Sequence, residues 1–149
     1  MGTLKLLDGV VDIYMSDMKY SDEKTAERLS GIKDYPSVNK AAIREMHRQV
    51  GDLWMDEQGV ARRGLLVRHL VLPDRLARTE EVVRFLAREV SLHTYRNIMA
   101  QYHPCLSAFD VLMLTRSVSK EEFYESINLD HQQSLDRLDK HHFPLTLSL

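Results

Sequence analysis

The sequence predicts an α/β fold in which parallel strands alternate with helices. Two apolar, β-branched runs of strand type, at 10–18 and 65–72, are separated by a segment whose apolar residues recur at helical spacing. A third such run, at 95–102, follows a second helical segment. Strands that alternate with helices are typical of βαβ units, which build a parallel sheet.

Length and composition indicate one domain, covering residues 1–149. The net charge is -2 with interspersed signs, which argues against a nucleic-acid partner. No apolar run approaches the roughly 18 residues of a membrane span, and acidic residues interrupt the N-terminus where a secretory signal would be apolar. The single cysteine, Cys105, excludes an intrachain disulfide. We therefore expect a cytoplasmic protein that binds neither nucleic acid nor membrane.

The first half of the chain contains the first strand, Val10–Met18. Ser21 is expected to cap a short helix, because acidic residues follow it in the first turn. A longer helix is expected from Tyr35-Pro36 to Gly51, since proline suits the first turn and glycine the C-terminus. Its apolar face comprises Val38, Ala42, Ile43, Met46 and Val50. A DEQG turn then predicts a small hairpin or a loop excursion around 53–60.

The second half repeats the alternation. The second strand, Leu65–Leu72, is stopped by a proline, and Thr79 is expected to cap a helix with a buried apolar stripe. The third strand is predicted at Tyr95–Tyr102. Two capping patterns predict further helices at Ser119–Ile127 and Asp130–Lys140. The tail 141–149 receives no firm assignment, although PLTLSL is compatible with a short strand.

Charged residues in these apolar strands indicate a site. Asp17 and Lys19 lie at the end of the first strand and Arg68 lies inside the second, where an unpaired buried charge costs several kcal/mol. An arginine there needs a planar anion or a carboxylate such as Asp17. Right-handed crossovers bring the strand ends to one edge, so Asp17, Arg68 and His103 are expected to line one pocket. A surface ion pair for Asp17 and a structural salt bridge for Arg68 remain alternatives.

A short pattern at the first strand end suggests a lyase. Asp17-x-Lys19-x-x-Asp22 resembles the DxKxxD motif of the barrels related to orotidine-monophosphate decarboxylase. The resemblance implies a lysine that acts on a carbanion beside two carboxylates. However, the glycine-rich phosphate loops of such barrels are not evident, and the chain is short for a closed eight-stranded barrel. A decarboxylase or lyase is therefore the weakest of the readings.

A longer resemblance covers most of the chain. The blocks DIYMSDMKY, SGIKDYPSVNKAAIREMHRQVG, GVARRGLLVRHLVLPD and NIMAQYHP resemble the C-terminal half of radical S-adenosylmethionine proteins similar to pyruvate formate-lyase activating enzyme. The resemblance implies the C-terminal part of a partial (β/α)6, TIM-like barrel with about three βα units. It also implies an oxidoreductase that uses S-adenosylmethionine and a 4Fe–4S cluster. The complete protein would cleave the cofactor reductively and abstract hydrogen from a glycyl-radical enzyme or a small molecule.

The resemblance also implies roles for individual residues. Asp17 and Lys19 match the DxK strand end beside S-adenosylmethionine, where the aspartate belongs to a monovalent cation site. Met15 would offer a backbone carbonyl to the same cation. Arg68 matches the arginine of an R-x-x-V-x-P strand that contacts the cofactor, and His103 matches a histidine that also contacts it.

One feature of the family is missing from the chain. A 4Fe–4S cluster in this family is held by a CxxxCxxC loop, and one cysteine cannot replace three thiolate ligands. We therefore expect a C-terminal fragment that contributes cofactor contacts and part of a substrate cavity but is inactive alone. The exposed edge of its first strand would favour self-association. A non-catalytic nucleotide-binding module is the alternative.

Overall fold

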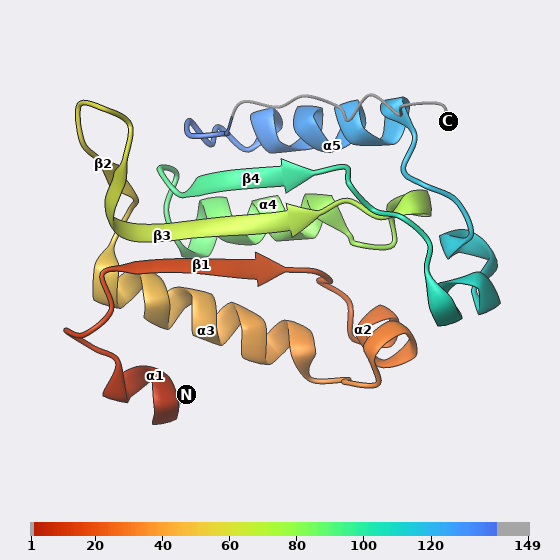
Figure 1. Cartoon of the computed structure of the whole chain (residues 1–149), viewed down its shortest axis with the longest axis horizontal. Coiled ribbons are helices and arrows are strands. Elements are labelled where there is room, and N and C mark those ends of the chain that lie inside the picture. Colours follow the sequence, from red (N-terminus) through yellow and green to blue (C-terminus); the bar gives the residue numbers. More distant parts are fainter. Residues whose placement is uncertain (1, 140–149) are drawn as a thin grey trace.

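The computed structural model describes residues 2–139, and its centre is an open four-stranded sheet (Figure 1). The strands are β1 (Ile13–Met18), β2 (Trp54–Met55), β3 (Ala61–Leu70) and β4 (Tyr95–Met99). Strand β3 pairs in parallel with β1 on one side and with β4 on the other. The first residues of β3 also pair antiparallel with β2. The predicted parallel α/β arrangement is confirmed, and a closed barrel is not present in the described chain.

Five α-helices of the described chain accompany the sheet: α1 (Gly2–Leu6), α2 (Glu23–Ser30), α3 (Tyr35–Val50), α4 (Thr79–Glu89) and α5 (Lys120–Gln132). Three short 3-10 turns complete the chain: η1 (Pro73–Arg75), η2 (Leu106–Asp110) and η3 (Leu112–Leu114). Figure 1 shows β4, β3 and β1 side by side, with α4 behind them. No helix within residues 2–139 is long and apolar enough to cross a membrane.

Several expected element ends shift by a few residues. Asp22, not Ser21, caps α2, because its Oδ2 accepts from the backbone N–H of Thr25 at 2.8 Å. Thr79 is the first residue of α4 instead of its cap. The strands begin or end within a few residues of the expected positions, since β3 continues backward into the hairpin with β2 and β4 stops at Met99.

The expected helix Asp130–Lys140 is wrong. Helix α5 runs through this boundary and ends at Gln132, and the chain then turns back to the sheet. The backbone N–H of Arg96 donates to the carbonyl of Arg137 at 3.0 Å, and the N–H of Asp139 donates to the carbonyl of Arg96 at 2.8 Å. Leu138 thus forms a parallel bridge at the outer edge of β4. The short strand considered for the tail lies outside the described residues.

Helices α3, α4 and α5 cover one face of the sheet. One apolar cluster joins Tyr14 and Met18 of β1 to helix α3 through Ile43 and to helix α4 through Leu86. A second cluster joins the end of the sheet to α5, and it comprises Val71, Ile98, Ala100, Val118 and Phe123. This burial follows the alternation of side chains along each strand, so the residues between these positions point to the opposite face.

No helix of the described chain covers that opposite face of the sheet, and we call it the open face. Met15 of β1 is 61% exposed there. Leu66 and Leu70 of β3 and Tyr95 and Met99 of β4 are only partly buried. A sheet with one bare, partly apolar face is usually completed by a further layer or a ligand.

Candidate functional site

The open face carries an ion pair at the C-terminal ends of the parallel strands. Asp17 and Arg68 are register partners on β1 and β3. The Nε of Arg68 donates to Oδ1 of Asp17 at 2.7 Å, and both side chains are 37% exposed. The pairing expected for Arg68 is therefore present. Its terminal guanidinium nitrogens have no hydrogen-bond partner within residues 2–139, so they are available to an anionic group.

The N-terminal part of α3 fixes the end of β1. The amide of Asn39 donates to the backbone carbonyl of Asp17 at 3.0 Å. The hydroxyl of Tyr35 accepts from the N–H of Lys19 at 3.0 Å and donates to the same Asp17 carbonyl at 3.4 Å. Burial raises the pKa of Tyr35, which keeps the phenol protonated. These contacts preset the backbone on which Asp17 and Lys19 stand.

Polar side chains continue beyond the Asp17–Arg68 pair onto β4. The sequence did not indicate these further residues as site residues. Asn97 of β4 is the register partner of Arg68. Its Nδ2 donates to Oδ2 of Asp139 at 2.9 Å, and the hydroxyl of Tyr95 donates to Oδ1 of Asp139 at 2.8 Å. Alternate side chains of a strand share a face, and Asn97 lies between the buried Arg96 and Ile98, so its side chain is on the open face. Asp139 carries no such signal in the sequence, because the capping pattern of its segment predicts a helix.

On the covered face, a buried histidine locks the same two strand ends. Nδ1 of His69 lies 2.7 Å from the carbonyl of Met18, and Nε2 lies 2.9 Å from Oγ1 of Thr79. A carbonyl only accepts, so Nδ1 carries the hydrogen and Nε2 accepts from Thr79. Burial lowers the pKa of His69. The neutral ring therefore ties β1, β3 and the start of α4 together directly behind the Asp17–Arg68 pair.

The remaining predicted site residues are more scattered. Lys19 follows the last residue of β1 and is exposed. Met15 lies on the open face one row from Asp17. His103 lies beyond the end of β4 in an exposed segment, where its Nδ1 is 3.3 Å from Oγ of Ser117. The structure thus joins Asp17 to Arg68, and the hydrogen-bond partner of His103 within the described chain is Ser117 instead of either of them.

The two implied cofactors fit the chain differently. On the open face, Arg68 offers guanidinium donors and Asp17 a carboxylate beside a partly apolar floor, and these are the groups that would hold S-adenosylmethionine. A 4Fe–4S cluster does not fit, because the chain has a single cysteine, Cys105, which is exposed. Within residues 2–139, no group of three or more His, Cys, Asp or Glu side chains is placed to hold a metal ion.

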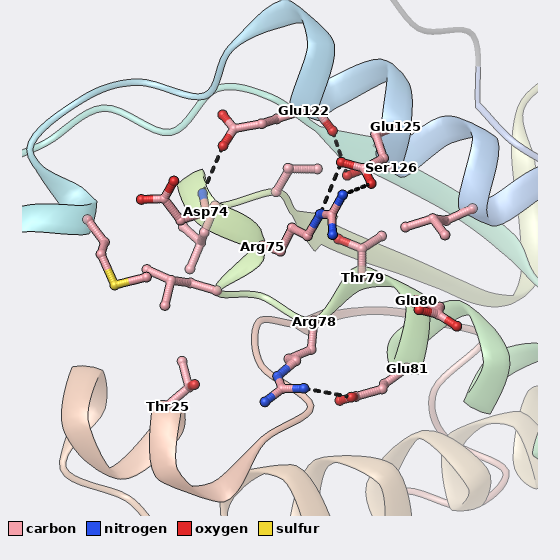
Figure 2. A pocket seen from close by; sticks show the side chains of 15 residues that line it. Thr25, Asp74, Arg75, Arg78, Thr79, Glu80, Glu81, Glu122, Glu125 and Ser126 are labelled. Atoms are coloured by element: carbon pink, nitrogen blue, oxygen red, sulfur yellow. Dashed lines mark hydrogen bonds and ion pairs between the residues drawn. The ribbon is translucent and has the colours of Figure 1, made fainter.

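A separate cavity of about 460 Å³ lies beside η1 and the first turn of α4 (Figure 2). Figure 2 shows Arg78 beside Glu81 and Arg75 beside Glu125, and these are ion pairs; the Arg78–Glu81 distance is 3.2 Å. Asp74, Arg75 and Arg78 all have left-handed backbone angles, which is costly for residues other than glycine. The arginines that line the cavity are thus already neutralised by neighbouring carboxylates.

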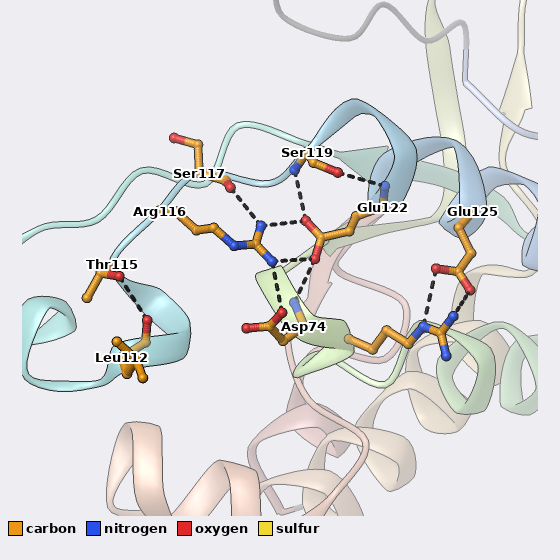
Figure 3. Close-up of polar contacts among 9 residues, drawn as sticks. Asp74, Leu112, Thr115, Arg116, Ser117, Ser119, Glu122 and Glu125 are labelled. Atoms are coloured by element: carbon orange, nitrogen blue, oxygen red, sulfur yellow. Dashed lines mark hydrogen bonds and ion pairs between the residues drawn. The ribbon is translucent and has the colours of Figure 1, made fainter.

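Two of the residues that line this cavity, Asp74 and Glu122, belong to an ion-pair network with Arg116 (Figure 3). Arg116 donates to Oδ1 of Asp74 at 2.9 Å and to Oε2 of Glu122 at 2.7 Å. Glu122 also accepts from the N–H of Ser119, which completes the capping box of α5. Arg116 lowers the pKa of Glu122 to about 2. We assign this network a structural role, because its contacts tie the β3–α4 loop to α5.

Comparisons with known proteins give one informative match. No protein-family model matches the chain, and no solved structure matches it. The chain is 29% identical over 134 residues to the uncharacterized protein MJ0674 of Methanocaldococcus jannaschii. The match covers 89% of this chain and 35% of the archaeal protein. The chain therefore spans about a third of the length of the curated relative that it matches.

Proposed function

We propose that this chain is the C-terminal part of a radical S-adenosylmethionine enzyme similar to pyruvate formate-lyase activating enzyme. The observation that carries the proposal is the Asp17–Arg68 pair on the open face of a parallel sheet, at the strand ends. Ligands of open α/β sheets bind outside the carboxyl ends of the strands. The match covers 35% of the archaeal relative, which is compatible with a partial (β/α)6 barrel completed by further sequence.

In this proposal the chain binds and orients the cofactor. Arg68 donates to its carboxylate, while Asp17 faces its positive charge or a monovalent cation that the carbonyl of Met15 also contacts. Lys19 and His103 approach it from the strand ends. The cofactor and the cluster would supply the radical chemistry in the complete protein. The described residues hold no thiolate set for the cluster, so no redox step is assigned to them.

The substrate of the complete protein is a glycyl-radical enzyme or a small molecule, and the compartment is the cytoplasm. The exposed thiol of Cys105 supports a reducing compartment, because free cysteines are uncommon on proteins of oxidising ones. The outer edge of β1, which pairs with no other strand of residues 2–139, and the open face support self-association of the chain when it is made alone.

The binding part of the proposal is tested on the 149-residue chain. Titration calorimetry and amide NMR should detect S-adenosylmethionine, with the largest shifts at Asp17 and Arg68. Loss of a charge-assisted hydrogen bond costs about 1.5–3 kcal/mol, so Arg68→Met should weaken binding by about tenfold or more. Arg62→Met is the matched control, because Arg62 lies on the same strand at the opposite end and pairs with Asp56. Equal binding by all three proteins would refute the assignment.

The catalytic part is tested on the gene. An in-frame CxxxCxxC upstream of this chain is expected, and the longer product, reconstituted anaerobically with iron and sulfide, should form 5′-deoxyadenosine. An intact upstream region without the motif would favour the nucleotide-binding module. The lyase reading is disfavoured, because Asp22 uses its carboxylate to cap α2 and bonds both N–H and Oγ1 of Thr25. An iron-independent activity abolished by Lys19→Ala would restore that reading.

A further inference from the structure

A further cavity, of about 370 Å³, lies on the hairpin that β2 forms with the first residues of β3. The residues that line it are Trp54, Asp56, Glu57, Gln58 and Arg62. Figure 1 shows this hairpin projecting from the N-terminal end of β3, whereas the Asp17–Arg68 pair lies at the C-terminal ends of the strands. The cavity is therefore separate from the candidate site, and we call it the hairpin cavity.

Trp54 supplies the aromatic surface of the hairpin cavity. Its side chain is 61% exposed, yet the backbone around it is firmly held. The preceding Leu53 is 2% exposed, and its carbonyl accepts from Nη1 of Arg137. Trp54 pairs across the hairpin with Arg63, whose Nη2 donates to the carbonyl of Gln49 at 2.9 Å. A fixed backbone thus presents an open indole, and aromatic side chains of this kind are enriched at protein interfaces.

Two charged groups of the cavity are already used by the hairpin itself. Oδ1 of Asp56 accepts from the backbone N–H groups of Gln58 at 3.0 Å and of Val60 at 2.9 Å. Nε of Arg62 donates to Oδ2 of Asp56 at 2.7 Å. The hydrogen bond from Val60 lowers the pKa of Asp56, so this carboxylate stays ionised. Asp56 and Arg62 therefore hold the turn, and each balances the charge of the other.

Glu57 is left with a carboxylate that nothing nearby balances. It is exposed in the turn, and its side chain has no hydrogen-bond or ion-pair partner within residues 2–139. The groups still available in the cavity are therefore one carboxylate, one aromatic face and the side-chain amide of Gln58. An anion would be repelled by Glu57. A cation would gain from the carboxylate and from the electron-rich face of the indole of Trp54.

The same groups favour a guanidinium over an ammonium. A guanidinium is planar, so it stacks on an indole while the N–H groups at its edge donate to a carboxylate. It is also less strongly hydrated than an ammonium, so less hydration is lost when it stacks. Arginine and tryptophan are, in addition, the residues that recur at the energetic centres of protein interfaces. The cavity therefore suits the side chain of an arginine.

We propose that the hairpin cavity binds an arginine side chain of a partner protein, with the guanidinium stacked on Trp54 and paired with Glu57. The occupant is assigned to a separate protein because the hairpin projects from the sheet and its available groups are complementary to a cation (Figure 1). The proposal does not depend on the proposed function, since the cavity shares no residue with the Asp17–Arg68 pair. The β2–β3 hairpin is then a docking arm at the end of the sheet opposite the candidate site.

The first test uses small probes on the wild-type chain. Trp54 is the only tryptophan of the chain, so its fluorescence and its indole N–H resonance report the cavity directly. N-acetylarginine amide should change both signals saturably, and the uncharged isostere N-acetylcitrulline amide should bind about threefold or more weakly. Equal affinity of these two probes, or no response at Trp54, would overturn the proposal. N-acetyllysine amide should also bind more weakly than the arginine probe, and equal binding would overturn the choice of arginine.

Variants then assign the binding to the cavity and to a partner. Glu57→Gln removes the charge and keeps the shape, so it should weaken the arginine probe about two- to fivefold and leave the citrulline probe unchanged. Glu27→Gln is the matched control, because Glu27 is an exposed glutamate of α2. Unchanged affinity in Glu57→Gln, folded by circular dichroism, would refute the site. In the longer gene product the indole resonance of Trp54 should still respond to the arginine probe. Loss of that response would place the arginine in the same protein and overturn the assignment to a partner.

Discussion

The buried ion pair between Arg96 and Asp130 should be the most sensitive single interaction of the fold. Nε and Nη2 of Arg96 donate to the two oxygens of Asp130, each at 2.7 Å, and Nη1 donates to the carbonyl of Thr94 at 2.6 Å. The two side chains are 2% and 0% exposed. Asp130→Ala would leave the Arg96 guanidinium buried with one of its three acceptors, the carbonyl of Thr94.

The expected cost follows from that imbalance. Removing one partner of a buried pair typically costs about 3–5 kcal/mol, because the other charge stays desolvated. For a chain of this length each kcal/mol lowers Tm by about 2–4 °C, so a fall of roughly 6–20 °C is expected. The pair joins β4 to the last turn of α5, so the loss should appear as a lower urea midpoint with an unchanged slope.

The controls separate burial from charge. Asp136→Ala removes a carboxylate that is 51% exposed and paired with His93, and it should cost at most about 1 kcal/mol. The double change Arg96→Met with Asp130→Leu replaces the pair by apolar groups and should recover most of the lost stability. A cost of less than about 1 kcal/mol for Asp130→Ala, or no recovery in the double variant, would refute the reasoning.

Three further outcomes are expected. Gly64→Ala should be strongly destabilising in urea unfolding, because Gly64 has φ +120 and a Cβ there would lie 2.4 Å from the carbonyl oxygen of Asp52, whereas Gly59→Ala, with nothing within 4 Å, should cost much less. Burial depresses the pKa of His69 below its ordinary value of 6.5. His69 therefore binds a proton more readily in the unfolded chain than in the folded one. Stability should fall as pH drops below about 6.5, by at most about 1.4 kcal/mol per pH unit, and folded His69→Gln should lack this slope. Light scattering should show self-association through the outer edge of β1, which is unpaired by any strand of residues 2–139, and a monodisperse monomer would contradict it.

The parallel sheet was predictable because its signals are local. Each strand is a β-branched run ended by a proline or a polar turn, and each helix between them carries an apolar stripe. The Asp17–Arg68 pair was predictable for a related reason. A charge in an apolar strand needs a partner, and the alternation of side chains left only neighbouring strands to supply it.

The contacts of the C-terminal segment were not predictable by the same reasoning. Arg96 lies inside the third strand, yet its partner Asp130 is far along the chain, and the turn after α5 decides that they meet. The capping pattern at Asp130 favoured a new helix, but the buried pair with Arg96 and the backbone bonds of residues 137–139 to β4 compete with it. Tertiary contacts of this kind override local propensity.

Contacts on both faces of β3 explain why a ligand can compete for Arg68 without separating β3 from β1. Arg68 and His69 are adjacent, and one points to the open face while the other is buried. Each links β3 to the end of β1, Arg68 through the Asp17 carboxylate and His69 through the Met18 carbonyl. Because His69 holds the strand ends from the covered side, the Asp17–Arg68 bond is not needed to keep them together. A ligand can therefore compete for Arg68 at the cost of one partly exposed ion pair, about 1 kcal/mol or less, without loosening the sheet.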